Sequence, residues 1–366
     1  MTARIDLDAT LAAIAALGPL DAAAMAAATS HLDGLTKPPG SLGRLEGLVV
    51  TLAGITGDPH ISMARRAIVV AAADHGVTRQ GVSAYPSDVT AQMIANFIEG
   101  GAAINALAAA ADASLTVIDV GVGGPIPDVA TGPRGGRLVS ARIRAGTADM
   151  TVGPAMTRGE AIAAIGVGLW AVDELRSAGL DLVGIGDMGI GNTTAASALV
   201  AALTGSSPGD VTGRGTGIDD IAHRRKVAAI ERALARNRPD PADPVGVLAA
   251  VGGLEIGALA GVILGCVAAR VPVVLDGFIT GAAALVAATL SPVVAERVIA
   301  SHRSVEPGHA VVLDRLGLLP LLDLDLRLGE GTGAALAVQL IDAAVRVRDE
   351  MATFASAAVS GPVGSA

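Results

Sequence analysis

The stretch from Gly184 to Ser197, GIGDMGIGNTTAAS, combines glycines with residues that can bind an anion. A short apolar run, residues 180–183, precedes it, and an apolar segment that predicts a helix, residues 194–203, follows it. A strand, a glycine loop and a helix start together form a typical anion site, because backbone N–H groups and the helix dipole face the ligand. Asn192 and Thr193 can cap the helix or add donors. A tight turn without a ligand is the alternative reading of this pattern.

A second glycine cluster, residues 213–217 (GRGTG), precedes a predicted helix that begins near Asp219 and carries Lys226. Only two of the 26 basic residues, Lys37 and Lys226, are lysines, whereas the others are arginines. A lysine provides a compact ammonium on a flexible stem, which a planar guanidinium cannot replace. Lys226 is therefore a candidate contact to a phosphate. Lys37 lies on a proline-stiffened arm, LTKPPG, which either contacts a site or only links two helices.

An acid stands between two glycines in the segment LRLGEGTG, residues 326–333, just before a predicted helix that runs to about Phe354. This acid is Glu330. A general base is commonly a carboxyl that is partly desolvated and held by backbone, since burial raises its pKa toward neutrality. A solvated loop glutamate is the plainer alternative.

Two further polar clusters have a structural alternative. Residues 301–309, SHRSVEPGH, contain two histidines and a glutamate, but their spacing matches no recognised zinc pattern, so we expect no metal. Asp74 and His75 follow a predicted strand, at the end of the strand where ligands bind in open α/β sheets. We expect these two residues to form a structural hydrogen bond rather than a catalytic dyad.

Apolar runs alternate with helical segments along the chain. Buried strands are predicted at four places: residues 67–73, 115–120, 180–185 and 271–275. Residues 125–156 predict an irregular excursion with an edge strand. Strands that alternate with helices predict an α/β fold, in which a mostly parallel sheet carries helices on both faces.

The capping residues predict where several helices begin. We expect Ser41 to cap the helix whose apolar face starts at Leu42, and Ser87 to cap one long helix over residues 88–110. Thr157 to Glu160 form a capping box. Two Ala-rich helices within residues 6–32 have few large apolar side chains, so they require a partner surface.

The composition excludes several classes of protein. A net charge of −9 without a basic block argues against nucleic-acid binding. The single cysteine, Cys266, excludes an internal disulfide and fits a reducing compartment. The N-terminal segment carries acids and is a poor signal peptide, so we expect a cytoplasmic protein. Residues 277–295 are uncharged, but their Gly, Thr, Ser and Pro favour buried helices over a membrane span.

Three other functions fit parts of the pattern. Gly184-x-Gly186-x-x-Gly189 matches the dinucleotide fingerprint, but no second strand with an acid follows about 20 residues later. A diphosphate-sugar transferase would have two adjacent acids after a strand, whereas Asp219 and Asp220 follow a glycine turn. A nucleotide sensor without catalysis would not need Glu330. A metal-free mononucleotide site fits best.

Taken together, the motifs resemble the nicotinate-nucleotide–dimethylbenzimidazole phosphoribosyltransferase family, almost over the whole chain and in order. The matching segments are LTKPPGSLGRLE (35–46), AADHGV (72–77), GIGDMGIGNTTAAS (184–197), LDGFIT (275–280), SHRSVEPGH (301–309) and LDLRLGEGTGAAL (324–336).

The resemblance implies a Rossmann-like sheet in a large α/β domain, residues 31–309, and a small helical domain from residues 1–30 and 310–366, assembled as a homodimer. The implied enzyme moves the 5-phosphoribosyl group of nicotinate mononucleotide to 5,6-dimethylbenzimidazole. The products are α-ribazole 5′-phosphate, for the lower ligand of cobalamin, and nicotinate. No metal or cofactor is implied.

The resemblance also assigns roles to residues. Glu330 matches the catalytic base, which takes the proton that the second ring nitrogen of the azole loses. The loops match the nucleotide-phosphate site at Gly189, Gly191, Asn192, Thr193, Gly215, Gly217 and Lys226. Asp187 stands where the family motif usually has glutamate, and it is expected to bind substrate with a carboxylate one methylene shorter. Ser83 and Gln92 are expected in the base pocket, which should be an aliphatic slot because aromatic residues make up 1% of the chain. Leu328 is also expected to bind substrate.

Overall fold

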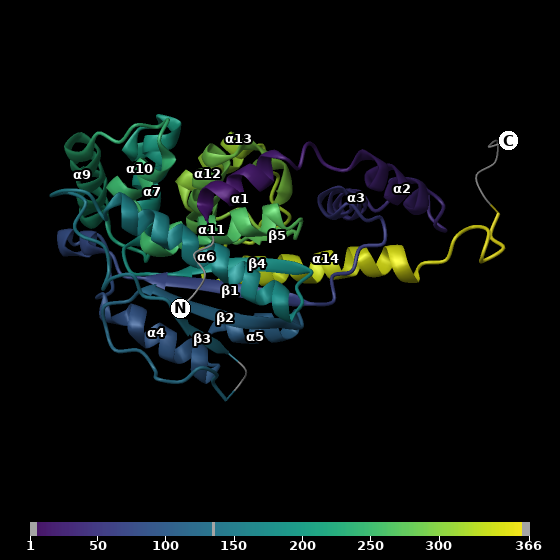
Figure 1. Cartoon of the computed structure of the whole chain (residues 1–366), viewed down its shortest axis with the longest axis horizontal. Coiled ribbons are helices and arrows are strands. Elements are labelled where there is room, and N and C mark those ends of the chain that lie inside the picture. Colours follow the sequence, from purple (N-terminus) through teal and green to yellow (C-terminus); the bar gives the residue numbers. More distant parts are fainter. Residues whose placement is uncertain (1–5, 134–135, 361–366) are drawn as a thin grey trace.

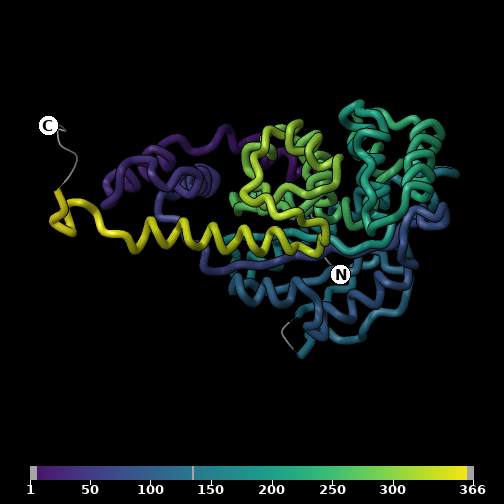
Figure 2. The backbone as a smooth tube through the Cα atoms, turned by 180° about the vertical axis from the view of Figure 1, so that it is seen from behind, coloured from purple at the N-terminus to yellow at the C-terminus, as the bar shows by residue number. Residues whose placement is uncertain are grey.

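The computed structural model describes residues 6–133 and 136–360. Residues 1–5 and 361–366 lie outside the described residues, and with them the ends of the predicted small domain and the first part of the segment analysed as a signal peptide. Figures 1 and 2 show a central sheet with helices above and below it.

The sheet has six parallel strands in the order β3-β2-β1-β4-β5-β6, which is the order of a doubly wound nucleotide-binding fold. The strands are β1 (Arg66–Ala73), β2 (Ala113–Gly121), β3 (Arg137–Ser140), β4 (Leu182–Met188), β5 (Val273–Leu275) and β6 (Val298–Ala300). The four predicted strands and the edge strand are confirmed, the latter as β3. The sequence did not predict β6, because three residues carry no readable periodicity.

Side chains of β1 alternate between two cores on the two faces of the sheet. Val69, Ala71 and Ala73 pack in the first core, whereas Ile68 and Val70 pack in the second. The helices of the first core are α6 (Arg158–Ala178), α7 (Asn192–Thr204), α10 (Pro244–Val251), α11 (Leu254–Ala268) and α12 (Phe278–Leu290). Those of the second are α3 (Arg44–Thr56), α4 (Asp88–Glu99), α5 (Ala103–Ala110) and α14 (Thr332–Glu350).

The remaining helices connect or flank these layers. They are α1 (Leu7–Ala15), α2 (Ala22–Asp33), α8 (Pro208–Val211), α9 (Asp220–Asn237), α13 (Pro307–Leu316) and the 3₁₀ helices η1 (Gly76–Gln80) and η2 (Pro292–Arg297). The predicted pair of N-terminal helices is confirmed as α1 and α2, and the predicted capping box is confirmed at Thr157 and Glu160.

Two predicted side-chain caps are wrong, although α4 begins at Asp88 as predicted. The helix predicted over residues 88–110 is two helices, because Gly100 adopts a left-handed φ of +80° after α4. Ser87 does not cap α4; its hydroxyl donates to Thr78 Oγ1 at 3.1 Å. Ser41 does not cap α3 either, since α3 begins at Arg44 after Gly43.

Lys37 has a structural role in this fold. Its ammonium pairs with Glu46 Oε1 at 2.9 Å, and both side chains are largely buried. The Glu46 carboxylate also accepts the Leu42 N–H at 2.8 Å, so the pair holds the arm against the first turn of α3. The structure therefore supports the linker interpretation of this arm.

An N-terminal pair of helices meets the C-terminal helix at one end of the molecule. Helices α2, α3 and the end of α14 lie side by side there (Figures 1 and 2), and Phe354 N–H donates to Gly34 O at 3.1 Å. Helix α1 instead packs against α6 and α11 of the first core. The predicted domain boundaries at residues 30 and 310 stay a prediction.

Among the described residues, the segment Asp88–Ala110 is the one long and apolar enough to cross a membrane by length and composition alone. The structure divides this segment into α4 and α5, whose apolar residues pack in the second core. The uncharged stretch over residues 277–295 forms α12, which is buried, and then η2.

Helices α6 and α11 cross closely because glycines face each other. A Cβ at Gly168 would lie 1.9 Å from Ala258 O, and one at Gly261 would lie 2.0 Å from Ile165 O. Gly166, on the same helix α6, has no atom within 4 Å of such a Cβ.

We therefore expect Gly168→Ala to lower the free energy of unfolding by about 1–3 kcal/mol or more, because the helices must separate. The matched control Gly166→Ala should leave it unchanged or raise it by up to about 1 kcal/mol, through better helix propensity. Urea unfolding followed by circular dichroism measures both. Equal effects of the two substitutions would contradict the close crossing.

Candidate functional site

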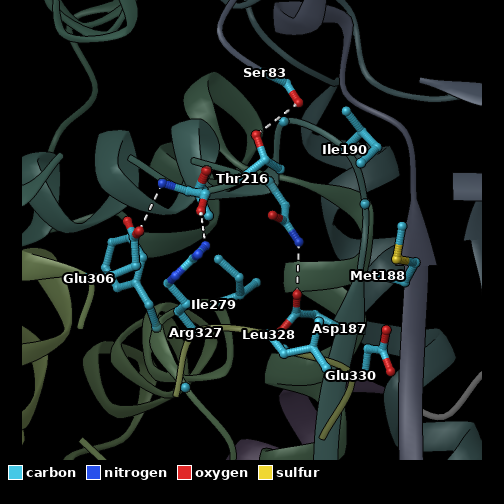
Figure 3. Close-up of a pocket in the computed structure, with 18 of the residues that line it drawn as sticks. Ser83, Asp187, Met188, Ile190, Thr216, Ile279, Glu306, Arg327, Leu328 and Glu330 are labelled. Carbon is cyan, nitrogen blue, oxygen red and sulfur yellow. Dashed lines mark hydrogen bonds between the residues drawn. The ribbon is translucent and has the colours of Figure 1, made fainter. Parts of the chain in front are cut away.

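A cavity of about 550 Å³ opens at the carboxyl edge of the sheet, next to the point where the strand order reverses between β1 and β4. Its walls come from loops that follow β1, β4, β5 and β6 and from the loop before α14. The lining segments are residues 82–93, 187–193, 215–216, 277–279, 302–306 and 327–330, each in part. Figure 3 shows this cavity with its lining side chains.

The first glycine loop has the predicted strand–loop–helix geometry. Strand β4 ends at Met188, and α7 begins at Asn192. Gly191 precedes α7 with φ +96°, and a Cβ there would lie 2.8 Å from Thr78 Cγ2, so only glycine fits. Asn192 and Thr193 line the cavity at the start of the helix. The Asn192 and Thr194 N–H groups donate to Gly189 O and Gly191 O at 3.1 and 3.0 Å, so the loop closes on itself and the Thr193 backbone and the positive end of the helix dipole lie at the cavity.

Lys226 contacts both glycine-rich segments but does not itself line the cavity. It is fully buried, and its Nζ donates to Thr193 Oγ1 at 2.8 Å and to Gly213 O at 3.2 Å. Burial lowers the Lys226 pKa to about 8, while the negative charge of Glu306 acts in the opposite direction. The ammonium therefore acts on the cavity through Thr193. Gly215 lines the cavity, whereas Gly217 is exposed and lies outside the lining.

Glu330 lies at another part of the cavity wall, beside Asp187 (Figure 3). The residue is 6% exposed and adopts an unusual left-handed φ of +64°. Its Oε2 has no hydrogen-bond partner among the described residues. Burial raises the Glu330 pKa to about 7, and a backbone hydrogen bond at Ile104 opposes that rise. A desolvated carboxyl with a free oxygen and a near-neutral pKa is suited to accept a proton.

Two more buried carboxyls flank Glu330. Asp187 Oδ2 accepts Asn192 Nδ2 at 2.8 Å, and burial, followed by the charges of Asp276 and Glu255, raises the Asp187 pKa well above its ordinary value. Asp276 follows β5, and burial raises its pKa to about 7 although backbone N–H groups at the start of α14 act against that rise. Burial therefore disfavours the charged form of Asp187 in the cavity wall.

Apolar side chains line the part of the cavity near the loop after β1. Val82, Val89, Met93 and Ile190 lie there, together with Ser83. The chain's only tyrosine, Tyr85, and Phe278 also line the cavity, so the predicted slot is not purely aliphatic.

The two candidates for the base pocket and the predicted substrate-binding residue Leu328 lie in different places. Ser83 lines the cavity, and its hydroxyl lies 3.4 Å from Thr216 Oγ1. Leu328 also lines the cavity although it is 58% exposed. Gln92 is exposed on α4 and does not belong to the lining residues.

Sequence reasoning assigned no role to several residues that line the cavity. Three of them belong to the polar cluster over residues 301–309, to which the sequence assigned no function: His302, Ser304 and Glu306. The fourth, Arg327, is close in sequence to the predicted base. The histidines of this cluster are neutral, because burial lowers the pKa of His302 to about 4 and that of His309 to about 3. Within the described residues, no group of three or more His, Cys, Asp or Glu side chains is placed to hold a metal ion.

The predicted hydrogen bond between Asp74 and His75 is wrong. His75 Nε2 instead lies 2.6 Å from Glu255 Oε1, and both side chains are buried beneath the glycine loop. Asp74 Oδ2 accepts the Gly123 N–H at 2.7 Å. Glu255 lies on α11, 180 residues from His75, so the sequence carried no signal for this pair.

The structure also argues against the dinucleotide reading. After β4 the chain runs through α7, α8, α9, α10 and α11 before the next strand, β5, which begins at Val273. A dinucleotide-binding unit needs a strand with an acid about 20 residues after the glycine loop.

Comparisons with known proteins agree with this arrangement. A family model described as a phosphoribosyltransferase matches residues 17–359. A protein of Chloroflexus aggregans named nicotinate-nucleotide–dimethylbenzimidazole phosphoribosyltransferase is 58% identical over 94% of this chain and 96% of its own length. A protein of the same name from Salinispora tropica is 54% identical over 94% of this chain and 98% of its own length.

A solved structure gives the same result at the level of the fold. The crystal structure of nicotinate-nucleotide–dimethylbenzimidazole phosphoribosyltransferase from Thermus thermophilus matches with a TM-score of 0.86 at 49% identity, over 94% of this chain and all of that chain. The chain is therefore a phosphoribosyltransferase and belongs to the nicotinate-nucleotide–dimethylbenzimidazole phosphoribosyltransferase family.

Proposed function

We propose that the cavity at the carboxyl edge transfers the 5-phosphoribosyl group of nicotinate mononucleotide to 5,6-dimethylbenzimidazole. The products are α-ribazole 5′-phosphate, which serves the lower ligand of cobalamin, and nicotinate. One observation carries this assignment of the site: a buried carboxyl with a free oxygen, Glu330, shares a cavity with an anion site made of two glycine loops. In Figure 3 these features lie at different ends of the lining.

The phosphate of the nucleotide binds at the glycine loops. The positive end of the α7 dipole, Thr193 and the Gly215 loop lie at this end, and the Lys226 ammonium donates to the Thr193 hydroxyl at 2.8 Å. Gly189 and Gly191 keep the loop free of side chains there. Gly217 belongs to the phosphate site only by resemblance to the family. Binding of this remote group orients the ribose for in-line attack.

The reaction needs one base and no acid. The nicotinate ring of the substrate is a pyridinium cation, so it leaves as a neutral ring nitrogen when the bond to the ribosyl carbon breaks. A nitrogen of dimethylbenzimidazole forms the new bond from the opposite face, which inverts the configuration. The other azole nitrogen loses its proton to Glu330. Asp187 lies beside Glu330, where burial raises its pKa and so favours its neutral form.

We expect Glu330→Gln to lower kcat by about 10²- to 10⁴-fold while the nucleotide KM changes little, because the amide cannot take a proton. In the unmodified enzyme, kcat/KM should fall below about pH 7 as Glu330 becomes protonated, and the variant should lose this limb. The control Glu350→Gln changes an exposed acid at the end of α14 and should behave normally. Near-normal turnover of Glu330→Gln would remove the assignment.

We expect Lys226→Ala to raise the nucleotide KM by about 10- to 100-fold, because a charge-assisted contact to the phosphate end is lost. The unmodified enzyme should bind the nucleotide less tightly above about pH 8, where Lys226 loses its proton, and the variant should not show this change. Arg224→Ala removes an exposed positive charge from the same helix and serves as the control. An unchanged KM in Lys226→Ala would place the phosphate elsewhere.

We also propose a homodimer. Leu319 is 77% exposed, and its carbonyl accepts Arg44 Nη2 at 2.8 Å, so it lies next to the start of α3, where Leu42 is also exposed. Exposed leucines that adjoin one another favour a protein contact.

The buried Cys266, as the only cysteine, is consistent with the proposed cytoplasmic location, which cell fractionation would test.

Light scattering should give twice the chain mass of 36.0 kDa, and Leu319→Asp should shift the protein toward the monomer by placing a charge in the contact. Val152→Asp, at a residue 69% exposed on another part of the surface, should not. A monomer in the unmodified protein would contradict the proposal.

A further inference from the structure

Glu306 is a buried acid that the proposed reaction leaves without a role. It is 6% exposed and lines the cavity next to the second glycine cluster. A carboxylate near a phosphate site is unfavourable, because like charges repel and burial removes their hydration. A carboxylate in this position therefore needs a partner that stabilises its charge.

The two oxygens of Glu306 have different surroundings. Oε1 accepts the Gly215 N–H at 2.8 Å, as Figure 3 shows. Oε2 is buried and has no hydrogen-bond partner among the described residues. Glu306 precedes α13 as its N-cap, yet its side chain makes no capping hydrogen bond. The carboxylate is turned away from its own helix and lies against Gly213 and Gly215 at the cavity wall.

A glycine leaves space for this carboxylate, and the Lys226 charge acts on it through space without donating a hydrogen bond to it. A Cβ at Gly213 would lie 2.1 Å from Glu306 Oε2, so the glycine makes room for the oxygen. The Lys226 ammonium donates to Thr193 and to Gly213 O instead. Arg327 Nη1 is directed at Gly215 O, 3.4 Å away. Oε2 is thus a buried acceptor whose hydrogen bond is left for a ligand.

The chemistry of the nucleotide identifies the donor. The phosphate and the nicotinate carboxylate of nicotinate mononucleotide are acceptors at neutral pH, and its only hydrogen-bond donors are the two ribose hydroxyls. The ribose must lie between the phosphate end and the reacting carbon near Glu330. Asp187, which also lines the cavity, already accepts Asn192 Nδ2 at 2.8 Å, so it is a poorer candidate than Glu306 as the acceptor.

We propose that Glu306 Oε2 accepts a hydrogen bond from a ribose hydroxyl of the nucleotide, and that Glu306 thereby selects ribonucleotides over deoxyribonucleotides. This inference rests on the proposed position of the phosphate at the glycine loops. It makes Glu306 a specificity residue: the carboxylate fixes the sugar, while Gly215 couples it to the phosphate loop.

The test measures binding by calorimetry for nicotinate mononucleotide and for its 2′-deoxy and 3′-deoxy forms. The unmodified enzyme should bind one deoxy form about 10- to 100-fold more weakly, as expected for a lost hydrogen bond to a charged group. Glu306→Gln keeps an acceptor for Gly215 N–H but replaces Oε2 by a donor. It should weaken ribonucleotide binding by a similar factor and weaken binding of that deoxy form little further.

Glu231→Gln makes the same chemical change at an exposed position of α9 and should leave all three affinities unchanged. Three results would overturn the role of Glu306. An equal loss of affinity for all three nucleotides in Glu306→Gln would mean that Glu306 acts only through the charge of Lys226, and tighter binding in this variant would mean that Glu306 repels the phosphate. The third result is that the unmodified enzyme binds the ribonucleotide and both deoxy forms equally. Failure of the proposed function is distinct, because the ribonucleotide would then not bind or would bind independently of Lys226.

Discussion

The position of the base depends on one carboxylate, that of Asp276, which holds the start of α14 against the end of β5. Asp276 Oδ1 accepts the N–H groups of Gly333 and Ala334 at 2.7 and 3.2 Å, and Oδ2 accepts that of Gly331 at 3.1 Å. A carboxylate at a helix start satisfies N–H groups that have no partner within the helix. Because Glu330 directly precedes these amides, the same contacts fix its unusual backbone conformation and direct its side chain at the cavity.

Glycines allow the loop that carries Glu330 to lie this close to the sheet. A Cβ at Gly186 in β4 would lie 2.1 Å from Gly331 N and 2.3 Å from the carbonyl carbon of Glu330, so the loop rests directly on the strand. The absence of a side chain likewise allows α6 and α11 to pack closely at Gly168 and Gly261. A chain with 47 glycines and 1% aromatic residues reaches a close-packed interior through backbone contact rather than through large side chains. The base is held rigidly because little flexible side-chain material separates it from the sheet.

The sequence revealed those features that local pattern determines. Apolar runs predicted β1, β2, β4 and β5, and the glycine loop before α7 was recognised because strand, glycines and helix follow one another in the chain. Other features depend on residues far apart in sequence, such as His75 with Glu255 or Glu306 with Gly215, and no local pattern encodes those contacts. Glu330 was recognised by its place between glycines, whereas Asp276, which positions it, looked like an ordinary strand exit. Roles in catalysis stay predictions for each of these residues.

The buried acids near the sheet edge suit a substrate that arrives with a positive ring. Burial and mutual repulsion raise the pKa of Asp187, and burial raises those of Asp276 and Glu330 to about 7, so the free enzyme holds protons that its carboxyls release readily. A cation placed among such groups lowers their pKa values by Coulomb attraction, which is stronger where water is excluded. In the proposed reaction, the pyridinium of the nucleotide therefore favours the ionised form of Glu330 before the azole is deprotonated. When neutral nitrogen replaces the cation in the products, this attraction ends, so under this proposal the charge of the substrate favours transfer of the azole proton to the carboxyl.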